Sequence, residues 1–157
     1  MLYQYNAAKK IVLETGQGYS TANSTWSDGR RKYYFYSAGG YLIKDSFSNK
    51  GTPTWTLGPR NTYIVNGDGN PIVTVSEGVN TGTNTYFLTR RTTTSYNGLQ
   101  SVADTVRFYD LPTSTWTDGA LIQYTRNGFG AVTQKIYNSW DAGIANYYPL
   151  IRDIYTI

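Results

Sequence analysis

Apolar and polar residues alternate in short runs along most of this chain, and glycine, asparagine or aspartate separates one run from the next. The runs occupy residues 32–44, 62–75, 84–94, 104–111, 119–137 and 147–157. Alternation with a period of two predicts strands, and turn residues recur about every 8–12 positions. The pattern therefore predicts an all-β, antiparallel sandwich or barrel built of hairpins.

Two hairpins are explicit in the sequence. Residues 63–65 and 72–75 flank the segment NGDGNP, and Asn127-Gly128 divides a second alternating run. Asn-Gly and Asp-Gly favour hairpin turns because these residues accept a positive φ. Helix-favouring residues gather only in 6–13, where we expect a helical turn or two.

All four tryptophans share one local pattern, Trp-x-x-Gly-x-x-x-x-Tyr. The copies begin at Trp26, Trp55, Trp116 and Trp140 and end at Tyr34, Tyr63, Tyr124 and Tyr148. Our interpretation is that Trp closes a strand, Gly forms the turn, and Tyr returns beside the Trp ring. Such a ring pair stabilises a hairpin by roughly 0.5–1.5 kcal/mol beyond burial.

A longer repeat relates the two halves of the chain. The segment STWSDG at residues 24–29 recurs as STWTDG at residues 114–119, and aromatic and glycine positions match at the same offset. We expect an N-terminal arm (1–10), a first β-module (11–91) and a second, related β-module (92–157). The alternative is one domain in which the motif repeats because hairpins repeat.

Composition excludes most familiar catalytic machinery. The 157 residues include no histidine and no cysteine, but 16 tyrosines and 16 glycines. Disulfides, thiolate nucleophiles, imidazole bases and the usual zinc or iron ligands are therefore excluded, and we expect no cofactor and no metal. The basic residues behind the net charge of +4 are scattered, so we expect no nucleic-acid partner.

Aspartates beside glycine turns are the remaining candidates for chemistry. Asp28, Asp118 and Asp141 each follow a Trp, and a pair of them would suit a glycosidase if their separation matched. Turns alone demand these residues, so we expect no enzyme. The alternating oxygens of Asn66, Asp68 and Asn70 resemble a calcium loop but lack the later Glu, which favours a plain turn.

Binding of carbohydrate is better supported by the same residues. Aromatic rings stack on sugar faces while Asp and Asn bind hydroxyl groups. The candidate ligand-binding residues are Trp26, Asp28, Tyr34, Trp116, Asp118, Tyr124, Trp140, Asp141 and Tyr148. The alternative is that the tryptophans form the core, in which case the contact residues are Tyr33, Tyr36, Tyr41, Tyr96 and Tyr147.

Residues 111–153 resemble the C-terminal knob-like modules of bacteriophage tail fibres and pyocin fibres. The matches are Pro112, Gly119, Leu121-Ile122, Gly128, Gly130, Thr133-Gln134, Ile136-Tyr137, Gly143, Tyr147-Tyr148 and Arg152. The Trp-x-x-Trp that closes those modules is absent here, where the chain reads DIYTI. The resemblance implies a trimeric virion module that contacts a host surface.

These observations together predict a non-enzymatic structural or adhesion module of a phage virion, in a tail fibre, a baseplate or a head decoration. Its expected partners are host-surface glycan, other virion proteins and further copies of itself, with a trimer first. The start of the chain resembles no signal peptide and no 18-residue apolar run occurs, so we expect no membrane insertion. The alternatives are a free-standing repeat lectin and a purely structural capsid or tail protein.

Overall fold

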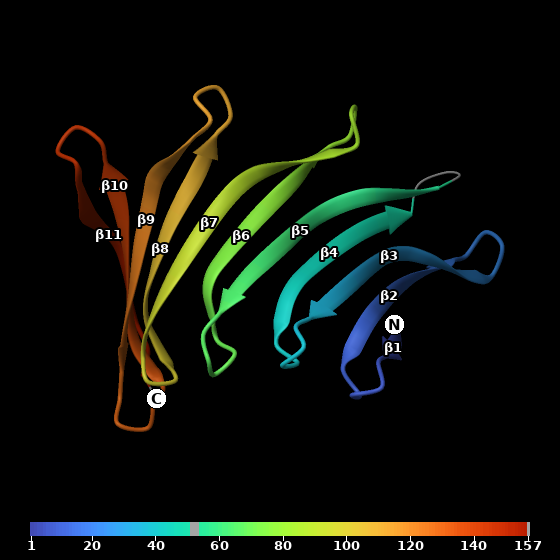
Figure 1. Ribbon diagram of the computed structural model, residues 1–157, viewed down its shortest axis with the longest axis horizontal. Helices are drawn as coiled ribbons and strands as arrows, with labels where there is room; N and C mark the ends of the chain where they lie inside the picture. The colour runs from blue at the N-terminus through green and yellow to red at the C-terminus, as the bar shows by residue number, and fades with distance from the viewer. Residues whose placement is uncertain (51–53, 157) are drawn as a thin grey trace. The chain divides into compact units, whose positions relative to one another are not determined.

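The computed structural model describes residues 1–50 and 54–156, and within them the chain forms eleven β-strands and no helix (Figure 1). All belong to one sheet whose order follows the chain from β1 to β11. The predicted all-β, antiparallel fold built of hairpins is confirmed. The strands are β1 (Leu2–Tyr5), β2 (Ile11–Ser20), β3 (Thr25–Tyr36), β4 (Leu42–Lys50), β5 (Trp55–Val65), β6 (Pro71–Asn80), β7 (Thr85–Asn97), β8 (Gln100–Asp110), β9 (Thr115–Arg126), β10 (Val132–Asp141) and β11 (Asn146–Ile154).

The N-terminal segment differs from both predictions made for it. Residues 1–10 are not an arm, because β1 pairs with β2. Residues 6–13 form no helical turn: the Asn6 side chain accepts a hydrogen bond from the amide of Lys10, and Lys9 takes a positive φ of 58°. A local side-chain cap and strand pairing thus override the helix preference of the two alanines.

Asparagine or serine opens the connection at one end of several hairpins. The amides of Asn6, Ser37, Asn66 and Asn127 donate to carbonyls four residues later at 2.8–3.0 Å. The Asn66 and Asn127 side chains also accept two amides each. Both predicted hairpin turns are therefore present.

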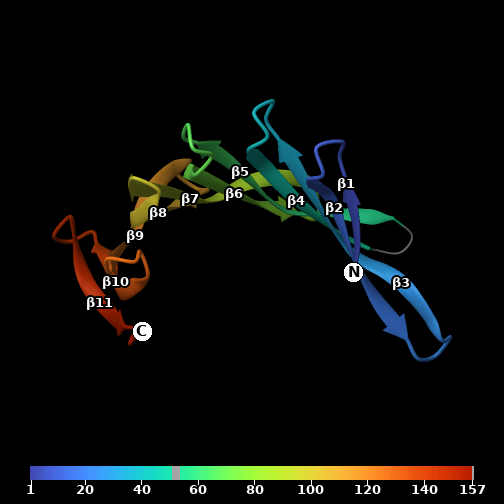
Figure 2. The ribbon, with the colours of Figure 1, turned by 90° about the horizontal axis from the view of Figure 1, so that it is seen from below.

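Four-residue turns close the opposite end of the hairpins. They span residues 21–24, 81–84, 111–114 and 142–145, and the last residue of each has a positive φ of 50–55°. The β2–β3 hairpin can be followed to its turn in Figure 2. The 81–84 turn lies 30 residues before 111–114, so the 90-residue offset seen in the sequence corresponds to three hairpin repeats.

β-Bulges explain the glycines of the tryptophan motif. The predicted hairpin is wrong for three copies, because Trp26 and Tyr34 lie together on β3, and the copies at Trp55 and Trp116 lie within β5 and β9. Only the copy at Trp140 spans a turn. Gly29 and Gly119 occupy register shifts, where the strand carries one extra residue.

The contacts divide the chain into two compact units that differ from the predicted modules. Unit 1 comprises Met1–Tyr63 with Ser76–Leu88, and unit 2 comprises Ile64–Val75 with Thr89–Ile157. The predicted boundary between residues 91 and 92 falls inside β7. The polar composition after Arg91 does not mark a boundary, because the threonines there continue β7, which pairs with β8.

Hydrophobic burial is slight among residues 1–50 and 54–156. Val106, 3% exposed, is the one buried hydrophobic residue in these ranges, and no side chain there is fully enclosed. Tyrosines bonded to carboxylates on the preceding strand recur instead: Tyr34 to Glu14 at 2.8 Å, Tyr63 to Asp45 at 2.9 Å and Tyr124 to Asp104 at 2.6 Å. Hydrogen bonds to a charged group contribute about 1.5–3 kcal/mol each.

Candidate functional site

Aromatic ring pairs lie beside three of the four-residue turns. Tyr19 packs on Trp26, Tyr109 on Trp116, and Trp140 on Tyr147, with ring centroids 5.3, 5.1 and 5.0 Å apart. Each turn places two residues seven positions apart directly opposite one another. The tilted or edge-on geometry is the favoured one for aromatic pairs.

Two of these pairs are neighbours in unit 2. We call the four rings, Tyr109, Trp116, Trp140 and Tyr147, the aromatic row. One pair belongs to β8–β9 and the other to β10–β11, so they are two strands apart across the sheet, roughly 9–10 Å. They are also staggered along the strands, because Ser139 pairs with Ala120 and Trp140 therefore stands beside Gly119, three residues from Trp116. All four rings are half-buried. Neighbouring pairs at this interval resemble a platform for successive rings of an extended ligand.

The bulge at Gly119 determines which side chains lie beside the aromatic row. On the turn side of the bulge Arg107 pairs with Asp118, whereas on the other side Val106 pairs with Ala120. Opposed residues share a face and successive residues alternate. Arg107 and Asp118 therefore share the face of Tyr109 and Trp116.

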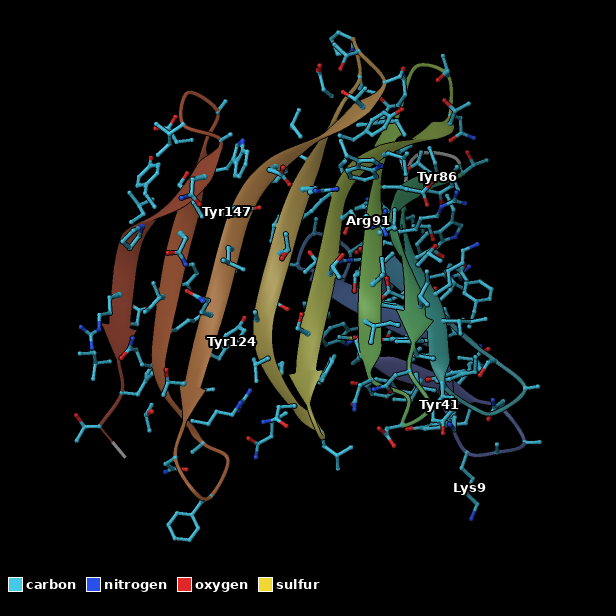
Figure 3. All side chains as sticks on the ribbon, turned by 60° about the vertical axis from the view of Figure 1, so that its left-hand side comes forward. Lys9, Tyr41, Tyr86, Arg91, Tyr124 and Tyr147 are labelled. Carbon is cyan, nitrogen blue, oxygen red and sulfur yellow. The ribbon has the colours of Figure 1, made fainter. Side chains whose placement is uncertain are left out.

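An ion pair joins the two ring pairs. Arg107 Nε donates to Asp118 at 2.6 Å, and half of the Arg107 side chain is exposed (51%). Burial raises the pKa of Tyr147, and the carboxylate of Asp118 raises it further. Tyr147 thus lies close to Asp118. Figure 3 shows Tyr147 near the turn end of its hairpin.

A second arginine faces this ion pair from β7. Arg91 stands opposite Arg107 in the strand register, and its Nε is buried without a hydrogen-bond partner. Arg91, Arg107 and Asp118 therefore carry one net positive charge beside the rings. Like charges directly opposite on a sheet are unfavourable.

The structure brings together three of the predicted ligand-binding residues, Trp116, Asp118 and Trp140, in unit 2. Trp26 and Asp28 are their counterparts in unit 1, where Asp28 binds Gln17 and Arg31. A hydrogen bond from Gln17 is the main cause that lowers the pKa of Asp28.

The other four predicted residues do not join the aromatic row. Tyr34 and Tyr124 follow the bulge and lie on the opposite face, where they bond to carboxylates. Tyr148 follows Tyr147 directly, so it also points to the opposite face. Asp141 accepts the amide of Gly143 at 2.8 Å and caps the turn.

The predicted contact tyrosines have mixed environments. Tyr41 is exposed (38%), whereas Tyr33, Tyr36, Tyr96 and Tyr147 are half-buried. The hydroxyls of Tyr36 and Tyr96 donate to the carbonyls of Ile11 and Pro71. Of this group, Tyr147 is the one that joins the aromatic row.

Tyr109, Arg107 and Arg91 belong to the candidate site but were not predicted from the sequence. The available signal was the tyrosine seven residues before a tryptophan, which occurs at Tyr19 and again at Tyr109. Register shifts cannot be read from alternation alone, so the face of Arg107 was not predictable.

The possible calcium loop is a turn. Asn66 Oδ1 accepts the amides of Asp68 and Asn70 at 3.1 and 2.9 Å, which uses the oxygen a metal would need. No group of three or more acidic, histidine or cysteine side chains among the described residues is arranged to hold a metal ion. In the same part of the chain, no helix is long and apolar enough to cross a membrane.

A hollow of about 280 Å³ lies on unit 1, on the face opposite Trp26 and Asp28. Its lining is Met1, Glu14, Gly16, Arg30, Lys32, Tyr34 and Phe47. The Arg30 guanidinium stacks 4.0 Å from the centre of the Phe47 ring.

The fold has a counterpart among solved structures. A protein of unknown function from Bacteroides fragilis is similar with a TM-score of 0.67 at 11% identity, over 87% of this chain and 96% of that one. A DUF3836 family protein from Bacteroides vulgatus has a TM-score of 0.42 at 8% identity, over 78% and 92%. The first likeness supports the fold alone. No family model and no curated protein matches the sequence.

Proposed function

We propose that this chain is a non-catalytic adhesion module that binds surface carbohydrate through the aromatic row of unit 2. The observation that carries the proposal is the pair of neighbouring ring pairs, with an ion pair between them. Ring faces cover the apolar faces of sugars, while Arg107 donates to hydroxyl oxygens and Asp118 accepts from hydroxyl groups.

The two-strand offset favours an extended glycan over a single sugar. The two pairs are roughly 9–10 Å apart across the strands and staggered along them, so they suit contacts to separate sugar rings of one linear chain. Because each ring is already packed against a partner, little side-chain entropy is lost on binding. A preformed aromatic platform of this kind needs no conformational change.

A glycan array with three purified proteins tests this proposal. The wild type, Trp116→Ala and Tyr148→Ala are labelled alike; Tyr148 is an aromatic residue of the same region that faces away from the row. We expect the wild type and Tyr148→Ala to bind the same glycans and Trp116→Ala to lose them. Absence of glycan binding by the folded wild type, or equal binding by all three, refutes the proposal.

The particle setting of the proposal rests on the resemblance of residues 111–153 to phage fibre modules. In that setting the glycan is part of a host surface, and the module is anchored by other virion proteins. Detection of the chain in purified particles by mass spectrometry supports this setting. Glycan binding by a chain that is absent from every particle fraction favours a free-standing lectin, and particle association without glycan binding favours a purely structural protein.

A homo-oligomer, a trimer first, is proposed to form through β11. This strand is at the end of the sheet order and exposes Leu150 (64%), Ile151 (53%) and Ile154 (69%). Exposed apolar edge strands tend to pair with other chains. Pro149 is tolerated there because an edge strand has one unpaired side.

A further inference from the structure

The hollow on unit 1 exists because a glycine stands opposite an arginine. Gly16 pairs with Arg30 in the register of β2 and β3, and the next pair on the same face is Glu14 with Lys32. With no side chain at Gly16, the hollow beside Arg30 is bounded there by Met1, whose sulfur would lie 4.0 Å from a Cβ at Gly16. Phe47 of β4 stands opposite Lys32 and bounds the hollow on the other side.

The matching positions of unit 2 show that the scaffold does not require this hollow. Ninety residues later, Gly16, Arg30 and Lys32 correspond to Val106, Ala120 and Ile122, which stand in the same register. The tyrosine–carboxylate pair is kept, since Tyr34 and Glu14 correspond to Tyr124 and Asp104. Unit 1 therefore replaces an apolar patch with an open, charged one on an otherwise equivalent frame.

The two cations of the hollow differ in what they contact. Lys32 is paired with Asp45 at 3.2 Å, so its charge is compensated. Arg30 is exposed, and within residues 1–50 and 54–156 no carboxylate lies in ion-pair distance of it. Its Cζ lies 4.0 Å from the centre of the Phe47 ring, so this ring covers one side of the guanidinium. A guanidinium held in this way suits two parallel hydrogen bonds to an oxyanion.

The opposite wall of the hollow is an acceptor. Glu14 is bound by the Tyr34 hydroxyl at 2.8 Å through Oε2, which leaves acceptor capacity on the carboxylate. Burial and this hydrogen bond to Glu14 raise the pKa of Tyr34 to about 12, so the phenol keeps its proton. A ligand that fits must therefore present an anion toward Arg30 and hydroxyl donors toward Glu14.

We propose that this hollow binds the carboxylate-bearing sugar of an acidic glycan, with the sugar carboxylate on Arg30 and a ring hydroxyl on Glu14. The inference goes beyond the proposed function, because it adds a separate site on unit 1 and names an acidic glycan as its class of ligand. A plain carboxylate lacks the hydroxyl donors, and a neutral sugar lacks the anion. A hexuronate carries both groups, a carboxylate that accepts from Arg30 and ring hydroxyls that donate to Glu14.

Titration of ¹⁵N-labelled protein with sodium glucuronate, followed by amide shifts of residues 14–16, 30–34 and 47, tests the inference. Glucose and inorganic phosphate serve as separate probes. We expect saturable shifts with glucuronate and none with glucose. Loss of a charge-assisted bidentate contact in Arg30→Gln lowers the affinity about 10- to 100-fold, and Arg30→Lys recovers little of it because the fork is lost.

A second variant closes the hollow without removing charge. A Cβ at Gly16 meets its nearest atoms at 3.7–4.0 Å, which is ordinary contact, so we expect Gly16→Val, which introduces the residue type of unit 2, to fold. It should abolish the glucuronate shifts. Arg152→Gln, which removes an exposed charge in unit 2, is the control and should leave them unchanged.

The outcomes separate this inference from the proposed function. No saturable shift with glucuronate in the wild type, unchanged affinity in Arg30→Gln, or tighter binding of phosphate than of glucuronate overturns the inference. Glucuronate binding that survives in Trp116→Ala is expected, because the aromatic row is a different site. Loss of glycan-array binding in Trp116→Ala with no effect of glucuronate on residues 14–47 keeps the proposed function and rejects the hollow.

Discussion

Replacement of Asp45 by asparagine tests whether polar networks hold this sheet together. The Asp45 carboxylate is 3% exposed and accepts hydrogen bonds from Asn61 and Tyr63, both at 2.9 Å, besides its ion pair with Lys32. In Asp45→Asn the single side-chain oxygen can accept from one of these three donors. The amide NH₂ group, itself a donor, then faces the other two.

The loss of stability can be calculated from the hydrogen bonds and the ion pair that the substitution removes. Hydrogen bonds to a charged group contribute about 1.5–3 kcal/mol each, and the Lys32 ammonium, whose side chain is 28% exposed, is partly stabilised by water. We expect Asp45→Asn to lower the free energy of unfolding by about 2–4 kcal/mol. The midpoint of thermal unfolding should fall by roughly 4–16 °C.

Urea unfolding followed by tryptophan fluorescence measures this change. Asp68→Asn is the matched control, because Asp68 is exposed in the 66–70 turn and its side chain contributes no hydrogen bond to that turn. The control should change stability by less than about 0.5 kcal/mol. If Asp45→Asn is as stable as the control, the carboxylate network does not carry the stability we assign to it.

Three further predictions concern tyrosine ionisation, packing at glycine positions and the edge strand β11. The pKa values of Tyr34 and Tyr63 are raised to about 12, mainly by burial; their contribution to stability is complete below the unfolded pKa of about 10 and is lost as the pH rises to about 12. Unfolding measured across that window should show the decline, and the double Phe variant should make it shallower without removing it, because burial also raises the pKa of Tyr124. Gly58→Ala brings a Cβ within 3.0–3.2 Å of Phe47 side-chain and backbone atoms and should cost about 1–3 kcal/mol, whereas Gly18→Ala, which meets nothing within 4 Å, should not destabilise; equal urea midpoints would contradict this. In light scattering we expect the wild type to have the mass of the proposed oligomer and Ile151→Arg that of a monomer; a monomeric wild type or an unchanged mass would exclude β11 as the interface.

The hairpin turns and the all-β class could be predicted from the sequence, because both depend on residues that are close together along the chain. Asn66 and Asn127 open turns because their side chains accept the turn amides, and this is visible in the sequence. The all-β class was likewise predicted from a local signal, the alternation of apolar and polar residues. The helical expectation at residues 6–13 failed because Asn6 caps a turn whose strands pair across it.

The types of residue in the candidate site were predicted from the sequence, but the face of the sheet on which each one lies was not. Trp116, Asp118 and Trp140 were identified, yet Tyr124 was assigned to the same site. The extra residue at Gly119 moves Tyr124 to the other face, and alternation does not reveal where a strand gains a residue. The hollow beside Arg30 depends on a cross-strand glycine, so it required the register of β2 and β3.

Fluorine NMR of protein labelled with 5-fluorotryptophan tests the central claim most directly, because the chain has four tryptophans and each gives one resonance. The resonances are assigned by single Trp→Phe substitutions, and a glycan retained on the array is then titrated. We expect the signals of Trp116 and Trp140 to shift along one saturation curve, while the signal of Trp55, whose ring is covered by the Arg31 guanidinium at 4.1 Å, stays in place. A saturable shift of Trp55 alone, or binding that leaves Trp116 and Trp140 unmoved, contradicts it.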